Sequence, residues 1–199
     1  NGIREAVAQS LYDEIVAFAN YAFNKAHAVC YAVVAYQTAY LKTHYPSQFM
    51  AALLSRNLSD RKKISFFMDE CKRMGISVFG PDVNESLHKF SVDKARNVRF
   101  GLAAVSGVGE AAAENIIQTR ISGGPYKSIY DFMERVNLHS VNKKCMEELC
   151  RAGAFDSIAG FERSKFFAQD AKGVTYLEQL LRYGNRVQFE KNNAQQSLF

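Results

Sequence analysis

Apolar residues recur every three or four positions along most of the chain, a spacing that predicts amphipathic α-helices. The first such stretch spans residues 3–22, where the apolar positions are Ala6, Val7, Leu11, Ile15 and Phe18. The next stretch, residues 28–44, is apolar on nearly every side. It predicts a helix that is buried on most of its surface, with Tyr31 and Tyr36 in the core. We therefore expect a mainly α fold.

Two more helices are predicted before the pattern changes. Pro46 fits the first turn of a helix over residues 46–56, because proline lacks the backbone N–H that this turn leaves unpaired. Ser59 is the expected cap of the next helix, which Gly75 ends. The inner face of that helix is expected to carry Ile64, Phe67, Met68 and Cys71.

From residue 76 short strands and turns replace the helical spacing. Strands are predicted within 76–79, 88–93 and 97–102, with a hairpin loop at 94–96. Helices then resume near residues 109–120, 128–136, 142–151 and 162–182. Ser128 and Asp131 resemble a capping box in which Asp replaces Glu. The polar segment 183–199 is expected to be flexible, except for its last few residues.

The stretch VSGVGE, residues 105–110, has the h-x-G-h-G form of a helix-hairpin-helix turn. Gly107 and Gly109 are expected to adopt conformations that a Cβ forbids, and Val108 to point inward. The N–H groups of Gly107, Val108, Gly109, Glu110 and Ala111 then begin the next helix without internal partners and form an anion site.

A DNA phosphate fits such a site, and contacts of this kind position a duplex without reading its sequence. Ala113, Ile116 and Ile117 support the interpretation by lying on one face of the following helix. A second, degenerate hairpin is predicted after helix 142–151, around Gly153. The alternative is a packed glycine-rich turn with no ligand.

Composition narrows the function classes. The net charge of +5 permits a nucleic-acid partner without requiring one. The four cysteines form no C-x-x-C motif, which argues against zinc or a disulfide framework and favours a reducing, cytoplasmic setting; they are Cys30, Cys71, Cys145 and Cys150. No apolar run approaches a membrane span, so we expect no membrane partner.

No catalytic constellation stands out. The chain contains no D-x-D motif, and its adjacent carboxylates diverge by about 100° on a helix, which does not suit a two-metal site. We expect no metal, no cofactor and no catalysis by this chain alone. It opens on Asn1 rather than Met, and we interpret it as a fragment.

Residues 23–55, FNKAHAVCYAVVAYQTAYLKTHYPSQFMAALLS, resemble the fingers of the bacterial replicative DNA polymerase III alpha subunit family. The similarity continues through MDECKRMGI, PDVN, FGLAAVSGVGE and LCRAGAFD, and so covers most of the chain. The resemblance implies a fragment without the palm, where the parent polymerase holds Mg²⁺. It also implies that the hairpins touch the duplex leaving the active site.

The resemblance further implies two contacts. Asn24, Lys25 and His27 match the motif that faces the incoming deoxynucleoside triphosphate, and either Tyr31 or Tyr36 could face the base. The last residues, QQSLF, resemble the pentapeptide that docks polymerases on the sliding clamp, with Leu198 and Phe199 as apolar anchors and Gln195 as a polar latch.

The expected organisation follows from both arguments. It comprises a helical fingers segment, a connector of strands, a tandem helix-hairpin-helix module, a C-terminal helix and a clamp-binding tail, over residues 1–79, 80–104, 105–160, 161–182 and 183–199. The expected partners are primer–template DNA, a deoxynucleoside triphosphate, the sliding clamp and other replicase subunits.

Two alternatives stay open. One is a DNA-repair or adaptor module that uses the hairpin without a polymerase; a glycosylase of this kind would need a catalytic Asp or Lys, and the available residues are Lys127, Asp131, Lys143 and Lys144. The other is a helical protein-interaction domain with no role on DNA.

Overall fold

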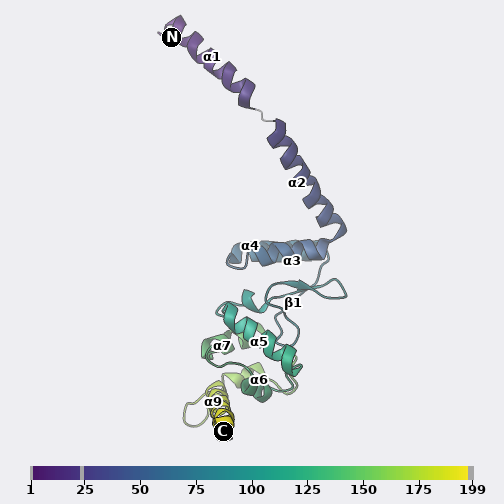
Figure 1. Ribbon diagram of the computed structural model, residues 1–199, viewed down its shortest axis with the longest axis vertical. Coiled ribbons are helices and arrows are strands. Elements are labelled where there is room, and N and C mark those ends of the chain that lie inside the picture. Colours follow the sequence, from purple (N-terminus) through teal and green to yellow (C-terminus); the bar gives the residue numbers. More distant parts are fainter. Residues whose placement is uncertain (1, 23–24, 197–199) are drawn as a thin grey trace. The chain divides into compact units, whose positions relative to one another are not determined.

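The computed structural model describes residues 2–22 and 25–196. The chain divides into two parts, residues 1–46 and residues 47–199 (Figure 1). The first part contains two helices, α1 (Glu5–Ala22) and α2 (Lys25–His44), as the apolar spacing predicts. The described helices and the small sheet of the second part confirm the expected mainly α fold.

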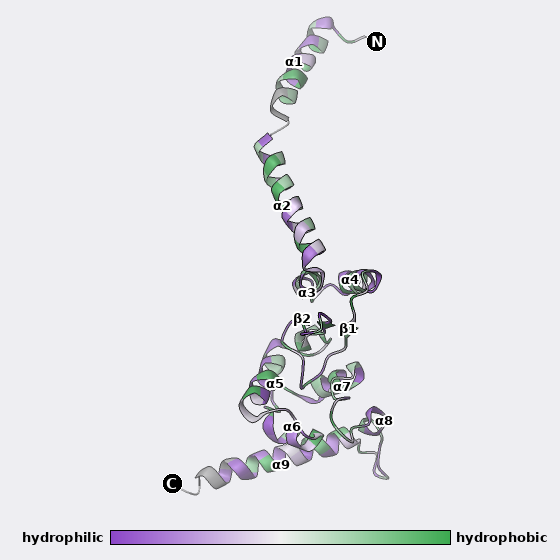
Figure 2. Cartoon of the chain, turned by 90° about the vertical axis from the view of Figure 1, so that its right-hand side faces the viewer, coloured by the Kyte–Doolittle hydropathy of each residue, from purple (hydrophilic) through white to green (hydrophobic). Residues whose placement is uncertain are grey.

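The burial predicted for α2 is wrong. No residue of this helix is buried, and Tyr31 and Tyr36 are 64% and 71% exposed. Figure 2 shows the hydrophobic residues that α2 presents along its length. An apolar helix gains stability when another element packs against it, but hydropathy does not show whether such an element is present. Within α2 the aromatic rings instead contact one another four residues apart, as in the pair Tyr40 and His44, whose centroids lie 4.2 Å apart.

The second part begins with a helical pair and a small sheet. Its first helices are α3 (Pro46–Arg56) and α4 (Arg61–Arg73). Asp60, rather than the predicted Ser59, caps α4, because its carboxylate accepts a hydrogen bond from the Lys63 N–H at 3.1 Å. Cys71 is fully buried on the inner face of α4, and Ile64, Phe67 and Met68 pack beside it, as predicted.

Three two-residue strands form the sheet, in the order β1-β3-β2. They are β1 (Val78–Phe79), β2 (Ser91–Val92) and β3 (Val98–Arg99). β1 pairs with β3 in parallel and β2 pairs with β3 antiparallel. The predicted loop at 94–96 joins β2 to β3, and Asp93 closes it by accepting two hydrogen bonds from Asn97.

The hairpin module follows the sheet. Its elements are the short 3-10 helix η1 (Leu102–Ala104) and the helices α5 (Glu110–Gly123), α6 (Ile129–Arg135), α7 (Lys143–Ala152), α8 (Arg163–Phe166) and α9 (Tyr176–Gln196). Their apolar faces share one core, in which Phe132, Phe155 and Phe166 are fully buried. Phe100 packs against both this core and the smaller one under α3 and α4.

The single helix predicted over residues 162–182 is wrong. A turn separates α8 from α9, because Gly173 has a φ of +75° and Asp170 accepts hydrogen bonds from the N–H groups of Lys172 and Val174. Helix α9 then continues to Gln196 through the segment that the sequence predicts to be flexible.

Contacts with α6 explain why α9 is so long. A Cβ on Gly184 would lie 2.9 Å from the Leu138 side chain and 3.1 Å from the Met133 carbonyl, so the two helices approach closely here. Gln188 donates hydrogen bonds to the carbonyls of Met133 and Val136. Polarity alone therefore misleads for residues 183–191, which are mostly polar but are held by specific contacts. No helix in the described ranges is long and apolar enough to cross a membrane.

Candidate nucleic-acid interface

The first hairpin joins η1 to α5 through residues 105–109. Val108 is only 6% exposed, and its N–H donates to the Val105 carbonyl at 3.1 Å, which closes the turn. Ala113, Ile116 and Ile117 are buried on one face of α5, as predicted. The inward position of Val108 is therefore confirmed, and it fixes where α5 begins.

The two glycines of the hairpin have different roles. Gly107 has a φ of +84°, which favours glycine, and a Cβ there would lie 3.0 Å from the Glu148 side chain of α7. Gly109 has an ordinary φ of −74° as the N-cap of α5, and a Cβ there would meet nothing within 4 Å. The prediction that the backbone conformation requires glycine is confirmed for Gly107 and is wrong for Gly109. Gly109 instead leaves the space in front of the helix end open.

The predicted anion site requires unpaired backbone donors at this helix end. Val108 uses its N–H inside the turn, so it is not one of the free donors that the sequence suggests. In the described part of the chain, the N–H groups of residues 109–112 have no protein acceptor. Four unpaired N–H groups and the positive end of the helix dipole attract an anion. The Glu110 carboxylate is exposed beside them.

A second hairpin lies between α6 and α7, at residues 136–142, and sequence reasoning missed it. Leu138, Ser140, Val141 and Asn142 repeat the h-x-G-h-G spacing with Ser and Asn in place of the glycines. Val141 is fully buried, as Val108 nearly is. Asn142 caps α7 by accepting from the Cys145 N–H at 3.1 Å. The signal was the apolar residue before an N-cap, which glycine matching alone does not detect.

Gly153 occupies a different kind of position. It ends α7 with a φ of +83°, and its N–H donates to the Cys150 carbonyl at 3.0 Å. Such a left-handed residue satisfies the last carbonyls of a helix rather than exposing its first N–H groups. The unpaired-donor argument therefore does not apply to Gly153, and its contact with DNA stays a prediction.

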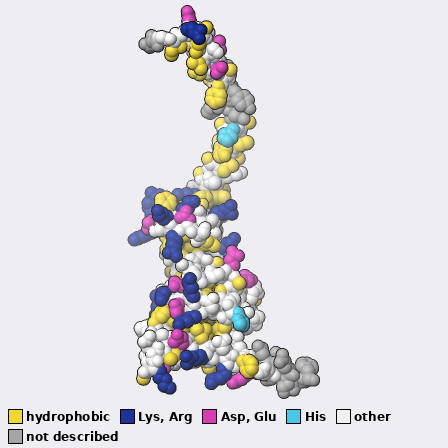
Figure 3. Space-filling model, turned by 90° about the vertical axis from the view of Figure 1, so that its left-hand side faces the viewer, with side chains coloured by type: hydrophobic (Ala, Val, Ile, Leu, Met, Phe, Trp, Pro, Cys, Tyr) yellow, Lys and Arg dark blue, Asp and Glu magenta, His cyan; other side chains and the backbone are white. Residues whose placement is uncertain are grey.

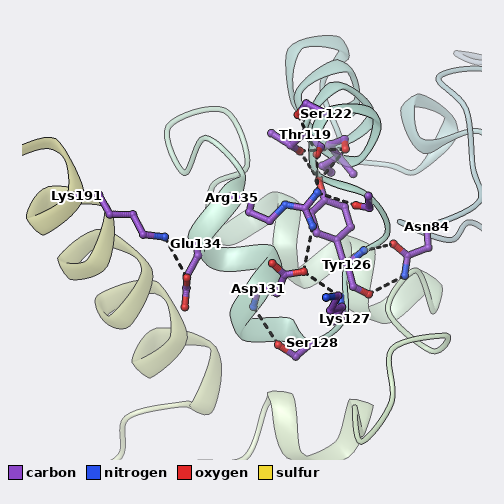
Figure 4. Close-up of polar contacts among 12 residues, drawn as sticks. Asn84, Thr119, Ser122, Tyr126, Lys127, Ser128, Asp131, Glu134, Arg135 and Lys191 are labelled. Atoms are coloured by element: carbon purple, nitrogen blue, oxygen red, sulfur yellow. Dashed lines mark hydrogen bonds and ion pairs between the residues drawn. The ribbon is translucent and has the colours of Figure 1, made fainter. Parts of the chain in front are cut away.

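A cluster of polar contacts around Arg135 and Tyr126 joins α5 to α6 (Figure 4). Arg135 of α6 donates to the carbonyls of Thr119 and Gly124, and its guanidinium lies over the Tyr126 ring, 4.5 Å from the centroid. Asn84 holds the Tyr126 backbone from the other side through two hydrogen bonds, of 2.7 and 3.0 Å. Burial raises the pKa of Tyr126, so the ring stays neutral.

Only one of the two hydrogen bonds of the predicted capping box at α6 is present. Ser128 accepts a hydrogen bond from the Asp131 N–H at 3.0 Å. The Asp131 carboxylate instead accepts from the Lys127 N–H, one residue before the cap. It also pairs with Arg135 at 3.0 Å. Asp131 therefore has a structural role in the polar cluster around Arg135.

The described side chains offer little support for a repair-enzyme site. Lys143 is paired with Glu178 at 2.8 Å, which raises the pKa of the lysine. Asp131 accepts from the Lys127 N–H and pairs with Arg135. Burial raises the pKa of Cys145 and of Cys150 to about 11, which makes both thiols poor nucleophiles near neutral pH. Among the described residues, no three His, Cys, Asp or Glu side chains are placed to hold a metal ion.

The other predicted site residues lie at the two ends of the chain. Lys25 and His27 are exposed in the first turn of α2, and the His27 ring lies 4.5 Å from that of Tyr31. Asn24, Leu198 and Phe199 lie outside the described residues. Gln195 belongs to α9, but its side chain is not described.

Comparison with known proteins places this geometry in a class. A family model described as a helix-hairpin-helix motif matches residues 75–166, the segment that carries both hairpins. Residues 75–166 therefore form a helix-hairpin-helix module.

The same comparison identifies the relatives. The chain is 44% identical to a DNA polymerase III subunit alpha of Thermus aquaticus over 92% of its length, and 42% identical to that of Vibrio cholerae over 79%. The similarity to the Xylella fastidiosa subunit, at 37% identity, covers the whole chain. The chain is thus related to a segment of DNA polymerase III alpha subunits, which confirms the resemblance seen in the sequence. It spans 14–16% of the length of these relatives.

The contrast between the glycines gives a stability prediction. Replacing Gly107 by Ala should lower the free energy of unfolding by about 1–3 kcal/mol, because alanine is strained at positive φ. Replacing Gly109 by Ala should change it by less than about 1 kcal/mol, since the lost N-cap preference and the stiffer unfolded chain nearly cancel. Urea denaturation followed by circular dichroism measures both values, and equal losses would contradict the assignment.

Proposed function

We propose that the C-terminal part of this chain grips the backbone of primer–template DNA, without sequence specificity, as one segment of a replicative DNA polymerase. The observation that carries the proposal is the first hairpin, where four unpaired N–H groups begin α5 beside the open Gly109. Backbone N–H groups at a helix N-terminus bind phosphate oxygens and carry no base preference. The second hairpin has a similar turn at α7, but the Asn142 side chain already accepts from one of the first N–H groups of that helix.

The polymerase reaction itself is proposed for the whole protein, on the names of its relatives. In that proposal the catalytic residues and their Mg²⁺ belong to a palm outside this chain, and other replicase subunits assemble with the whole protein. This chain contributes binding surfaces. The reducing, cytoplasmic setting belongs to the same proposal, and the four free cysteines are consistent with it.

The test of DNA gripping uses Gly109→Val. Valine suits the φ of −74° and has room, but its side chain stands where a phosphate would approach the N–H groups. We expect duplex affinity to fall about tenfold, equivalent to ~1.4 kcal/mol, with the fold retained. Fluorescence anisotropy with a labelled primer–template at several salt concentrations measures the effect.

Gly80→Val is the matched control. Gly80 also lacks a positive φ, and a Cβ there would meet only the Ala152 carbonyl, at 3.9 Å, near the end of α7. This variant should bind DNA as the unmodified chain does. If Gly109→Val kept full affinity while remaining folded, the hairpin would be structural only.

Incoming-nucleotide binding by Asn24, Lys25 and His27 is a further part of the proposal. It is supported by the family motif and by the exposure of Lys25 and His27 at the start of α2. A lysine offers a compact charge to a triphosphate, and a histidine donates to a phosphate oxygen. In the full-length protein, a photoreactive deoxynucleotide should label Lys25, and Lys25→Ala should abolish the adduct. Labelling that persists in this variant would refute the role.

Docking of QQSLF on a sliding clamp completes the proposal. Leucine and phenylalanine anchors next to a polar latch suit a hydrophobic pocket with a polar rim. A labelled peptide of residues 190–199 should bind the clamp, and Leu198→Ala with Phe199→Ala should weaken binding at least tenfold. Substituting Asn192 and Asn193 by Ala is the control and should leave the affinity unchanged. Equal affinity of both variants would rule out the motif.

A further inference from the structure

Several cations of the second part are paired with a neighbouring carboxylate. Arg73 pairs with Glu70 at 2.5 Å, Lys143 with Glu178 at 2.8 Å, and Arg151 with Glu148 at 2.9 Å. Pairs of this kind leave little net charge for a polyanion. Cations without such a pair are therefore the better candidates for contact with a phosphate.

Other exposed cations of the described ranges are in no such pair, and three of them lie on α4 and α7. Arg61, Lys62 and Lys144 are exposed, and no carboxylate lies within ion-pair distance of them; the first two begin α4 and the third belongs to α7. Figure 3 shows Lys and Arg side chains gathered at the level of α3 and α4, whereas acidic side chains lie among the basic ones farther down that face.

Two of these cations converge on the first hairpin. The Arg61 guanidinium donates a hydrogen bond to the Ser106 hydroxyl at 2.7 Å. On the next residue, a Cβ built on Gly107 would lie 3.7 Å from Cε of Lys144. The side chains of α4 and α7 thus flank the turn that leads to the unpaired N–H groups of α5.

We propose that Arg61 is a phosphate-binding residue that extends the DNA contact of the hairpin onto α4. The inference rests on the proposed grip of duplex DNA. It goes beyond that grip because Arg61 lies outside residues 75–166, the segment that the helix-hairpin-helix family model matches. The ligand is a backbone phosphate of the duplex next to the one at the α5 N-terminus.

The chemistry of the side chain supports this role. A guanidinium carries five N–H donors in a fixed fork, and Ser106 takes one of them, so a phosphate can accept from the others. The Ser106 hydroxyl also restrains a long side chain before the ligand arrives, which reduces the entropy lost on binding. No carboxylate of the described chain competes for Arg61.

The test is the salt dependence of duplex binding by the 199-residue chain. Each neutralised phosphate contributes about 0.9 to the slope of log Kobs against log salt concentration. Arg61→Ala should therefore make the slope shallower by about 0.9 and weaken binding equally for unrelated sequences. Arg61→Lys should restore most of the slope, because the charge returns. Anisotropy titrations with a labelled duplex at five salt concentrations give these slopes.

Two control variants separate a phosphate contact from other effects. Ser106→Ala removes the tether but keeps the charge, so the slope should not change. Arg73→Ala removes a paired cation at the other end of α4, and it should also leave the slope unchanged. Circular dichroism verifies that each variant is folded.

The outcomes are distinguishable. If the unmodified chain binds DNA and Arg61→Ala has the same slope, the inference is overturned while the grip by the hairpin stands. If Arg61→Ala and Arg73→Ala lower the slope equally, general basicity replaces a specific contact and the inference is again overturned. If the unmodified chain shows no salt-dependent binding, the proposed function fails and the inference fails with it.

Discussion

The close approach of the first hairpin to α7 is the constraint on which the helix-hairpin-helix module depends. Gly107 permits it, because a side chain at a φ of +84° would be strained and would press on Glu148. The approach lets Val108 enter the core, and the buried valine in turn determines where α5 starts. A backbone held in this way presents its first N–H groups outward before any ligand arrives. Preorganisation of this kind spares the ordering entropy that a flexible loop would lose on binding.

The same solution occurs twice with different residues. At each entrance an apolar side chain is buried one residue before the N-cap: Val108 before Gly109, and Val141 before Asn142. The asparagine side chain satisfies one donor of α7, whereas glycine satisfies none at α5. The first hairpin therefore keeps more donors for a ligand, and the second gains more stability from its own cap. The contacts of Arg135 with Thr119 and Tyr126 hold α6, the helix before the second entrance, against the end of α5.

The sequence predicted local structure correctly where residue spacing or a turn residue determines it. The buried face of α5, the inward Val108 and the loop between β2 and β3 follow from spacing and turn residues, and all are observed. The exposure of α2 was not predictable, because burial depends on which element covers a helix. The turn at Gly173 depends on local hydrogen bonds to Asp170 that the helical spacing does not reveal. The ordered α9 depends on contacts with distant residues such as Glu134. The second hairpin was hidden because Ser140 and Asn142 occupy the two positions where glycines are expected.

The attachment of α9 determines how mechanical load would travel through the module. Tyr183 and Lys191 both contact Glu134, which lowers the pKa of that carboxyl and keeps it charged, and Gln188 binds the last carbonyls of α6. A force applied at the C-terminal end of α9 therefore enters through the end of α6. From there it reaches the second hairpin directly, since Val136 begins that loop. Tension at the end of α9 would thus act first on the loop that begins at Val136, so that α9 would work as a lever on the second hairpin.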